Sequence, residues 1–476
     1  MAIKTAKEYI ESLKKVNPEF YAFGEKIENV IEHPLIKPSI RSVAVTYELA
    51  NIPEYEDLMV TKSSINNEKI NRFNHLFISQ EDLIKKVRML RLCGQKTGTC
   101  FVRCLGMDAI NALYITTYRI DKKYGTEYHN RLKKFIDYIQ KNDLTCHAAM
   151  TDVKGDRSKR PSEQNDPDLY LHVVEERRDG IIVRGAKAHQ TGAGCAHEAI
   201  VMPTCRMLES DKKYAIAFAI PTNTKGIIYV YGRFPMDTRE IEGIDVGNIK
   251  YGKHSPLMIF DDVFVPWDRV FMYQEYEFAE EIVTYFSAYH RQSHGGCKAG
   301  MNDVLIGAAS LIAKYNGVAD ASHVKSKIAD MVHLVETIYS CAIASSVESR
   351  KTEAGIYFVN NLLANVSKLN EAINCYEIAR LAQDIAGGLV ATMPSEKDLK
   401  NEKIGKFIEK YLKGIPNVST IDRMKVIRLI EHMTLSIDLL SDLHGAGSPE
   451  AQKIGIRRLA NLEEKEKLVK SILNIN

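Results

Sequence analysis

The chain has 476 residues, of which 45% are hydrophobic and 26% are charged, and its formal net charge at pH 7 is +3. This composition is typical of folded globular proteins and excludes wholesale disorder, collagen-like repeats and a small disulfide scaffold. The balanced charge gives no basis for nucleic acid or an anionic membrane as a partner. At about one domain per 100–200 residues, the length predicts about three domains.

The N-terminus and the cysteines bear on where the protein works. Residues 1–15 form a short amphipathic pattern without the apolar core and cleavage site of a signal peptide. No uncharged apolar run reaches the ~18 residues of a membrane span, so we predict no membrane segment and a cytoplasmic location. Thiols stay reduced there, and nine cysteines, an odd count, are either inert core thiols or metal ligands.

Helical spacing dominates the first third of the chain. Apolar residues recur at three- and four-residue intervals over 79–124, where Gly94 and Gly98 indicate a division into two helices. A further amphipathic helix is predicted over 131–142. This part is therefore expected to be helical.

The pattern changes near residue 145, where short β-rich runs separated by Gly, Pro and Asp begin. Two of these runs meet at Asp179-Gly180 and predict a hairpin. After Glu275 the helical spacing returns. Long helices with short connections, typical of a bundle, are predicted at about 277–316, 320–349, 354–386 and 420–443.

This order predicts an α+β fold rather than alternating βαβ units. We expect an N-terminal α-helical domain over 1–145, an antiparallel β domain over 146–276 and a C-terminal α-helical bundle over 277–476. The sequence has no GxxxxGK[ST] and no complete GxGxxG in a βαβ unit, which disfavours P-loop and NAD sites.

Cys100 and Cys104 form a C-x3-C pair. On a helix the two positions share one face about one turn apart, so both sulfurs could reach one metal centre. Two core cysteines are the alternative, and the spacing taken alone favours them because free cysteine is commonly buried.

Residues 289–300, YHRQSHGGCKAG, hold a second candidate group of ligands. His290 and His294 face the same way one turn apart, and Cys297 lies two turns, about 10 Å, beyond His290. If His290 and Cys297 share a metal, the helix is predicted to be interrupted at Gly295-Gly296, since glycine pairs break helices. An unbroken helix through Cys297 would contradict the shared binding. The alternative is a satisfied histidine pair beside a glycine helix contact.

Together the two segments supply three cysteines and a histidine. Tetrahedral zinc and an iron–sulfur cluster with one histidine ligand both fit this set, and ligand chemistry does not choose between them.

Two further segments offer polar or flexible backbone. Thr151, Lys154, Gly155 and Arg157 lie in a loop at the start of the β-rich part and suit phosphates or a flavin edge; a polar surface loop is the alternative. The glycines of DIAGGLVATMPS (384–395) permit close approach by a pyrophosphate or another backbone, or they simply end a helix.

Six ordered motifs, QKTGTCFVRC, MTDVKGDR, VRGAKAHQTG, YHRQSHGGCKAG, DIAGGLVATMPS and HGAGSPEAQ, carry a resemblance over nearly the whole chain. They resemble the 4-hydroxyphenylacetate 3-hydroxylase flavoprotein family, and within it the branch that dehydrates 4-hydroxybutyryl-CoA and isomerises vinylacetyl-CoA. The resemblance implies an acyl-CoA dehydrogenase-like fold, a homotetramer, a CoA thioester substrate, and FAD with a 4Fe–4S cluster in each subunit.

The resemblance also implies roles for individual residues. The cluster ligands match Cys100, Cys104, His290 and Cys297, which favours iron–sulfur over zinc. The FAD contacts match Met150, Thr151, Lys154, Gly155, Asp156, Arg157, His189, Gln190, Thr191 and Gly192, with Gly387 and Gly388 reaching the FAD of a neighbouring subunit.

The family reaction implies radical chemistry in which a base takes the α-proton, the flavin accepts an electron and the β-hydrogen, and the cluster acts as a Lewis acid. His290 matches the proposed base, and Lys298 supplies a positive charge near flavin or substrate. Three positions depart from the family. His294 replaces a tyrosine, while Ser255 and Ser441 replace glutamates, with Asp442 a possible substitute for the second.

These departures leave alternatives open. A paralogue acting on a different acyl-CoA or related substrate keeps all four cluster ligands. An FAD-dependent aromatic monooxygenase has no reason to keep them, and a zinc-stapled or degenerate scaffold would have lost catalysis with its carboxylates. The cofactor prediction is therefore firmer than the substrate prediction.

Overall fold

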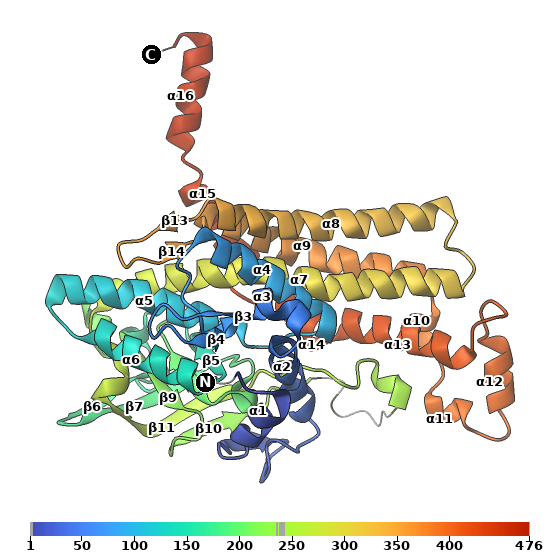
Figure 1. Cartoon of the computed structure of the whole chain (residues 1–476), viewed down its shortest axis with the longest axis horizontal. Coiled ribbons are helices and arrows are strands. Elements are labelled where there is room, and N and C mark those ends of the chain that lie inside the picture. Colours follow the sequence, from blue (N-terminus) through green and yellow to red (C-terminus); the bar gives the residue numbers. More distant parts are fainter. Residues whose placement is uncertain (1–2, 235–236, 238–242, 476) are drawn as a thin grey trace.

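A layer of long helices lies over strand-rich layers in the computed structural model, which describes residues 3–234, 237 and 243–475 (Figure 1). The helices are α1 (Ala6–Leu13), α2 (Lys37–Ala50), α3 (Glu56–Met59), α4 (Gln80–Thr97), α5 (Cys104–Tyr124), α6 (Tyr128–Lys141), α7 (Ala279–Tyr315), α8 (Ser322–Val347), α9 (Asn361–Ala386), α10 (Leu389–Thr392), α11 (Glu396–Leu399), α12 (Gly405–Tyr411), α13 (Thr420–Leu435), α14 (Ile437–Asp442), α15 (Pro449–Leu459) and α16 (Leu462–Leu473).

Two sheets share one core in the strand-rich part. The six-stranded sheet has the order β2-β1-β10-β11-β7-β6 and the four-stranded sheet has the order β12-β9-β8-β5. Phe218 of β9 and Phe260 of β11 meet edge to face across them, with ring centroids 6.1 Å apart. The strands of these two sheets are β1 (Glu19–Ala22), β2 (Glu25–Lys26), β5 (Cys146–Ala149), β6 (His172–Arg177), β7 (Gly180–Lys187), β8 (Glu198–Val201), β9 (Ile216–Pro221), β10 (Ile227–Val230), β11 (Leu257–Pro266) and β12 (Val270–Tyr273).

The predicted hairpin is confirmed: β6 and β7 pair antiparallel, and Arg177 lies opposite Gly180. One strand pairing, however, does not follow from the order of the strands along the chain. β1, from the part expected to be helical, pairs parallel with β10 some 200 residues later. Two small ladders complete the strands: β3 (Val60–Lys62) with β4 (Lys69–Asn71), and β13 (Arg350–Lys351) with β14 (Tyr357–Phe358). The fold mixes helices and sheets as predicted, while the domain boundaries remain predictions.

The helical predictions are confirmed with shifted ends. Ser79 and Asp82 form a capping box that begins α4, and Gly98, with φ of +63°, ends it. Gly94 lies inside α4 rather than dividing it. The helix expected over 420–443 is split at Ser436, whose side chain caps α14 by accepting a hydrogen bond from the Asp438 amide.

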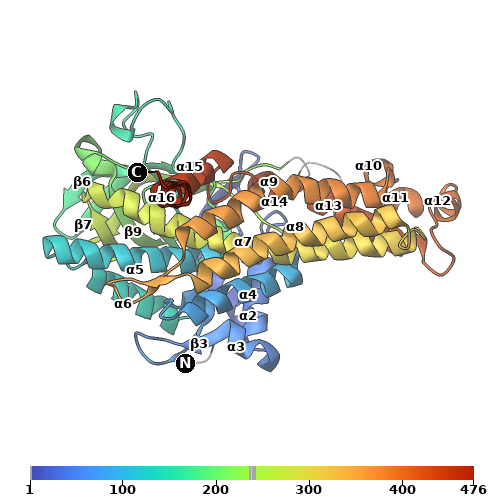
Figure 2. The same cartoon turned by 90° about the horizontal axis from the view of Figure 1, so that it is seen from above.

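Four of the long helices, α7, α8, α9 and α13, lie side by side as a bundle in both views (Figures 1 and 2). Of these, α8 has the length and apolar composition of a helix that could cross a membrane, with a mean hydropathy of 1.2 over its best window. It packs against α7 and α9, and 28% of that window is buried in the single chain. At the C-terminus, α16 projects from the body and has no buried residue (Figure 1).

Candidate active site

Two separate elements carry the predicted cysteine ligands Cys100 and Cys104. Cys104 begins α5, but Cys100 lies in the loop after Gly98 ends α4, so the expected shared helix face is wrong. Val102 between them has φ of +66°, a left-handed turn that bends the loop back. Each of these two sulfurs is within electrostatic range of the other and of Cys297 from α7.

The predicted interruption at Gly295-Gly296 is also wrong, because α7 runs unbroken from Ala279 to Tyr315. The two glycines serve close helix packing instead. A Cβ on Gly295 would lie 2.3 Å from Ala342 Cβ in α8, and one on Gly296 would lie 2.5 Å from the Val87 carbonyl oxygen in α4. A helix that packs on several sides tolerates a glycine cost of roughly 1 kcal/mol each.

By the criterion stated above, the unbroken helix excludes one metal ion bound by both His290 and Cys297. In the described parts of the chain, no three or more His, Cys, Asp and Glu side chains form a group that could hold a metal ion. A four-iron cluster makes a different demand, because each ligand bonds its own iron. Three cysteines and His290 remain chemically suited to that larger group.

His290 is held the way metal-binding histidines usually are. Its Nδ1 lies 2.9 Å from Oδ2 of Asp108, one turn beyond Cys104 on α5. Ser293 Oγ donates to the same carboxylate oxygen at 2.8 Å, and Lys86 Nζ pairs with the other oxygen at 2.7 Å. No hydrogen bond involves His290 Nε2 among the described residues. A carboxylate on one imidazole nitrogen fixes the ring and leaves the other nitrogen for a metal.

The burial of two predicted ligand thiols also bears on iron binding. Cys104 and Cys297 are buried, and burial raises the pKa of both. Among the described residues, each thiol has one long polar contact to a carbonyl of its own segment. The Cys104 sulfur lies 3.7 Å from the Val102 oxygen, and the Cys297 sulfur lies 3.9 Å from the His294 oxygen. Binding iron as thiolates would compensate the cost of deprotonating these buried groups.

A buried charge cluster, defined here as His294, Lys298, Lys368, Glu371 and Asp442, lies next to these ligands. Lys298 of α7 pairs with Asp442 of α14, and Lys368 pairs with Glu371 within α9. Lys368 Nζ also donates to the Asp442 carbonyl at 2.6 Å, and His294 Nδ1 lies 3.6 Å from Glu371 Oε2. The cluster therefore joins three helices through charge.

The cluster fixes the charge of two predicted catalytic residues. Burial lowers the pKa of Lys298, but Asp442 and Asp438 outweigh it and hold the pKa well above the usual value, so Lys298 is a cation. Burial and the nearby Lys368 hold the pKa of His294 well below its usual value, so His294 is neutral. A tyrosine at this position would also be neutral at pH 7.

Sequence reasoning missed four residues of this site: Lys253, Lys368, Glu371 and Asp438. Lys253 Nζ donates to Ser441 Oγ at 2.6 Å and lies 3.8 Å from Asp438, which accepts a hydrogen bond from Thr99. Lysine and glutamate three residues apart on a buried stretch of α9 were the available signal, because such charges are rarely buried unless paired.

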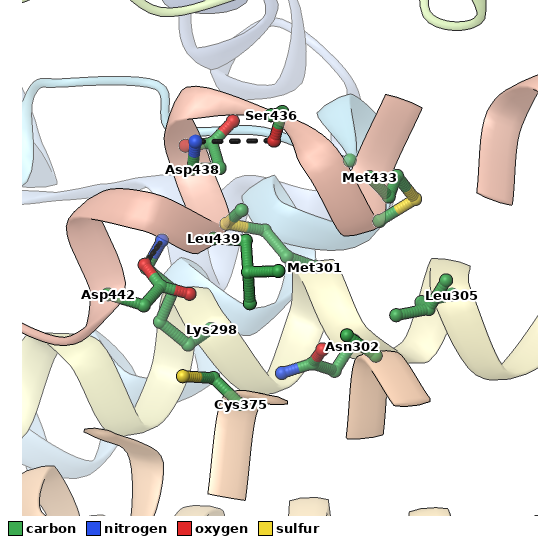
Figure 3. Close-up of a pocket in the computed structure, with 12 residues that line it drawn as sticks. Lys298, Met301, Asn302, Leu305, Cys375, Met433, Ser436, Asp438, Leu439 and Asp442 are labelled. Carbon is green, nitrogen blue, oxygen red and sulfur yellow. Dashed lines mark hydrogen bonds and ion pairs between the residues drawn. The ribbon is translucent and has the colours of Figure 1, made fainter. Parts of the chain in front are cut away.

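A small cavity of about 20 Å³ opens beside Lys298, between α7, α9 and α14 (Figure 3). Lys298 and Asp442 face each other at one end, and Cys375 approaches from α9. This volume holds about one ordered water. Asn302 and Met301 on the next turns of α7 complete the polar and apolar sides of the cavity.

The two predicted flavin segments lie together. The Ala188 amide donates to the Thr151 carbonyl at 2.8 Å, and Lys187 Nζ donates to the Met150 carbonyl at 3.1 Å. Burial, with the charge of Lys154, lowers the pKa of His189. The remaining predicted residues of these segments are Gly155, Asp156, Arg157, Gln190, Thr191 and Gly192, and the positive φ of His189 (59°) and Gly192 (76°) shapes the second turn.

Ser255 and the Gly387-Gly388 pair relate differently to this region. Ser255 Oγ lies 2.8 Å from Thr191 Oγ1, so one of the family departures adjoins the flavin turn. Gly387 and Gly388 lie between α9 and α10, at the end of the bundle away from the sheets (Figure 1), and a Cβ on either would meet nothing within 4 Å. Within one chain these glycines are not brought to the flavin segments.

Comparisons with known proteins agree over the whole chain. Residues 5–272 match the family described as 4-hydroxyphenylacetate 3-hydroxylase N terminal, and residues 279–474 match 4-hydroxyphenylacetate 3-hydroxylase C terminal. The 4-hydroxybutyryl-CoA dehydratase/vinylacetyl-CoA-Δ-isomerase of Clostridium aminobutyricum is 53% identical over 99% of this chain and 100% of its own length.

Solved structures show the same relationship. An oxygen-tolerant archaeal 4-hydroxybutyryl-CoA dehydratase from N. maritimus matches with a TM-score of 0.97 and 49% identity, covering 100% of this chain and 96% of that one. The oxygenase component (HpaB) of 4-hydroxyphenylacetate 3-monooxygenase, complexed with FAD, matches with a TM-score of 0.86 over 99% and 98%; at 24% identity it shows the fold alone. This chain belongs to the 4-hydroxyphenylacetate 3-hydroxylase family, in the branch of the 4-hydroxybutyryl-CoA dehydratases/vinylacetyl-CoA-Δ-isomerases.

Proposed function

We propose that this protein is an FAD- and 4Fe–4S-dependent dehydratase that removes water from 4-hydroxybutyryl-CoA or a related hydroxyacyl-CoA by radical chemistry. Isomerisation of vinylacetyl-CoA is its expected second activity. The observation that carries the proposal is the setting of His290. Its Nδ1 is bound to Asp108, and its Nε2 makes no hydrogen bond among the residues that the structure describes. The proposed cysteine ligands come from adjoining segments. Full-length identity of 53% to a dehydratase supports the same reaction.

The residues fit both cofactors. Cys100, Cys104, His290 and Cys297 would hold the cluster, since three buried or half-buried thiols and an oriented imidazole are suitable ligands. The 150–157 loop and the 189–192 turn would hold FAD, since they lie side by side and offer backbone amides, hydroxyls and cations. When bound, the flavin supplies reversible electron transfer and the cluster supplies Lewis acidity.

The protein's own groups then divide the remaining work. Lys298, kept cationic by Asp442, stabilises negative charge on a thioester that loses its α-proton. His290 is the candidate base: its Nε2 would take that proton when it is not bound to iron, and Asp108 would orient the ring and stabilise its protonated form. Neutral His294 lies between them on α7, with its ring centroid 5.0 Å from that of His290 and its Nδ1 3.6 Å from Glu371 Oε2.

A change of substrate within the same branch is the second candidate. His294, Ser255 and Ser441 stand where the family carries a tyrosine and two glutamates, and all three are at the site described above. Asp442 is engaged with Lys298, which supports its role as the substitute carboxylate. Smaller hydroxyl groups at two positions leave room and lose charge, which favours a different hydroxyacyl group.

Aromatic monooxygenation is the weaker alternative. The HpaB structure shares the fold at 24% identity, whereas the dehydratase structure shares it at 49%. A monooxygenase would need the flavin segments alone, so the buried Lys86–Asp108–His290 group and the three thiols would have no task.

Cofactor content and turnover test the proposal together. Anaerobically purified protein should contain flavin and about four iron and four sulfide per chain, and should convert 4-hydroxybutyryl-CoA to crotonyl-CoA. Flavin without iron would overturn the proposal in favour of a monooxygenase, and zinc without flavin would indicate a structural site. If both cofactors are present but 4-hydroxybutyryl-CoA is not turned over, the substrate is a different hydroxyacyl-CoA. His294→Tyr with Ser255→Glu should then raise activity on 4-hydroxybutyryl-CoA.

Asp108→Asn probes the orientation of His290. We expect iron content to fall and the free energy of unfolding to drop by about 3–5 kcal/mol, because Lys86 is left as an unpaired buried charge. Asp303→Asn is the matched control: it breaks a half-exposed pair with Arg91 and should cost about 1 kcal/mol or less with iron unchanged. Equal iron content in the two variants would contradict the role of Asp108.

Assembly as a homotetramer in the cytoplasm completes the proposal. In this single chain only 28% of the most apolar window of α8 is buried, and α16 carries exposed leucine, isoleucine and valine side chains. The open backbone at Gly387-Gly388 is suited to a cofactor held by another subunit. A second copy of the chain would cover these surfaces at once.

A further inference from the structure

A second, larger cavity of about 370 Å³ is lined in part by the 150–157 loop. Five cationic side chains line it: Lys154, Arg157, Lys159, Arg160 and Arg206. The volume lies in the range of small-molecule sites, roughly 300–1,000 Å³. This basic cavity, defined by these five residues, is distinct from the cavity beside Lys298.

Nearby carboxylates offset part of the charge of the basic cavity, and Arg206 lies 3.9 Å from one of them, Glu280. The one acidic lining residue of the cavity, Asp152, is already paired with the buried Lys187. Arg160 lies 3.6 Å from Asp211, and Lys159 lies 4.0 Å from Asp156. Lys154 and Arg157 have no ion-pair partner among the residues that the structure describes. The cavity is therefore suited to an anion with several charges.

The wall of the cavity also offers an aromatic surface. Tyr170 lines it, and its hydroxyl donates to the Lys154 carbonyl at 3.1 Å, which fixes the side chain. Aromatic rings and arginine planes beside a basic pocket are the groups on which a nucleotide base stacks. Phosphates with an adjoining base are thus the ligand chemistry that the cavity matches.

We propose that Lys159, Arg160 and Arg206 bind the phosphates of the nucleotide end of coenzyme A. This inference rests on the proposed function and names the part of its substrate that the sequence left unassigned. FAD is the other phosphate-bearing ligand here, but it carries a pyrophosphate alone. Coenzyme A adds a third phosphate on the ribose, and Lys159, Arg160 and Arg206 are the cations of the cavity that remain when Lys154 and Arg157 are assigned to FAD.

The location supports a division between the two ligands. Lys154 is at the junction, since its charge acts on His189 in the predicted flavin turn. Arg160 and Arg206 line the same cavity but belong to segments that the resemblance does not connect with FAD. The nucleotide would bind at these residues and the pantetheine arm would lead toward the flavin.

Binding measurements on the holoenzyme test this site. The probes are coenzyme A, adenosine 3′,5′-bisphosphate and FAD, measured by calorimetry and by flavin retention. Arg206→Gln removes a side chain that is 74% exposed and 3.9 Å from Glu280, so the fold should be unaffected. We expect it to weaken coenzyme A and the bisphosphate about tenfold, as for the loss of one charge-assisted contact. Arg160→Gln should do the same, with FAD retained.

Lys225→Gln, at an exposed lysine of the same part of the chain outside the cavity, is the matched control and should leave all three affinities unchanged. Unchanged affinity for coenzyme A in both arginine variants would overturn the inference. Loss of FAD with coenzyme A binding intact would overturn it too, by giving the phosphates to the flavin. In either of these outcomes, binding of coenzyme A by the wild-type holoenzyme would still support the proposed function. Wild-type protein that neither binds coenzyme A nor turns over a thioester would overturn both the proposed function and this inference.

Discussion

Buried ionisable residues are the distinguishing feature at the residue scale, and each is either paired or neutral. Lys86 and Asp108 have side chains with no exposure and lie 2.7 Å apart. His147 and His254 take the second route. Burial, with a smaller effect of the neighbouring His254, lowers the pKa of His147 to about 3, and burial alone lowers that of His254 to about 3. Desolvation of an unpartnered imidazole disfavours its charged form.

His147 should therefore make stability depend on pH. In the unfolded chain histidine takes a proton near pH 6.5, whereas folded His147 does so only near pH 3. Its contribution is present above pH 6.5 and is lost as pH falls through the window between these values, at about 1.4 kcal/mol per pH unit. Neither ring nitrogen of His147 has a hydrogen-bond partner among the described residues. His147→Leu should remove this part of the slope of unfolding free energy between about pH 6 and pH 4.

Urea unfolding at several pH values measures the slope. His323→Leu, at an exposed position on α8, is the control, and it should retain the wild-type slope. Equal slopes for His147→Leu and the wild-type protein would contradict the account.

At the scale of elements, the main feature is the close packing of α4 against α7. Glycines on these two helices set the distance between them. A Cβ on Gly94 would lie 2.5 Å from the Cys297 carbonyl oxygen, and one on Gly300 would lie 2.0 Å from the Arg91 carbonyl oxygen. The same contact places Cys297 near the loop that carries Cys100 and near the start of α5 at Cys104. Backbone contact between α4 and α7 therefore positions the ligand set.

Gly300→Ala should force the two helices apart. We expect a loss of about 1–3 kcal/mol in unfolding free energy, with lower iron content, because Arg91 backbone cannot yield as a side chain end could. Gly307→Ala on the same helix is the control, since a Cβ there meets nothing within 4 Å. It should stabilise by about 0.5–1 kcal/mol through helix propensity. The same sign of change in both variants would show that packing does not decide at Gly300.

At the scale of the whole molecule, the exposed apolar side chains are concentrated where the single chain gives no partner. Leu468 is 65% exposed and Ile472 is 79% exposed on α16, which buries none of its own residues. A projecting amphipathic helix costs little to fold only if another surface receives it. The proposed tetramer supplies such a surface.

Removal of α16 should separate assembly from folding. A chain ending at Ala460 is expected to keep its circular dichroism spectrum but to lose the tetramer mass in analytical ultracentrifugation. Leu468→Lys with Ile472→Lys should act likewise in the full chain, whereas Lys470→Gln on the same helix should have no effect. A truncated chain that stays tetrameric would contradict the role of α16, and monomeric wild-type protein would contradict the tetramer.

The sequence by itself determined the local periodicities, the hairpin and the family, because these depend on neighbouring residues and on motifs; the ligand residues that it names remain a prediction. It misjudged what depends on distant contacts. Gly295 and Gly296 read as a helix break, but their task is packing against α8 and α4. Cys100 read as helical, but it lies in a loop closed by Gly98 and Val102.

Only the tertiary structure revealed which charges meet. The Lys368–Glu371 pair on α9 follows helical spacing, but Lys298 on α7 and Asp442 on α14 are far from it and from each other in the chain, and no spacing rule connects the three helices. The parallel pairing of β1 with β10 is likewise non-local. Buried charges must find partners wherever the fold places them, so their pairing is decided by the packing of whole elements and cannot be read from any one segment.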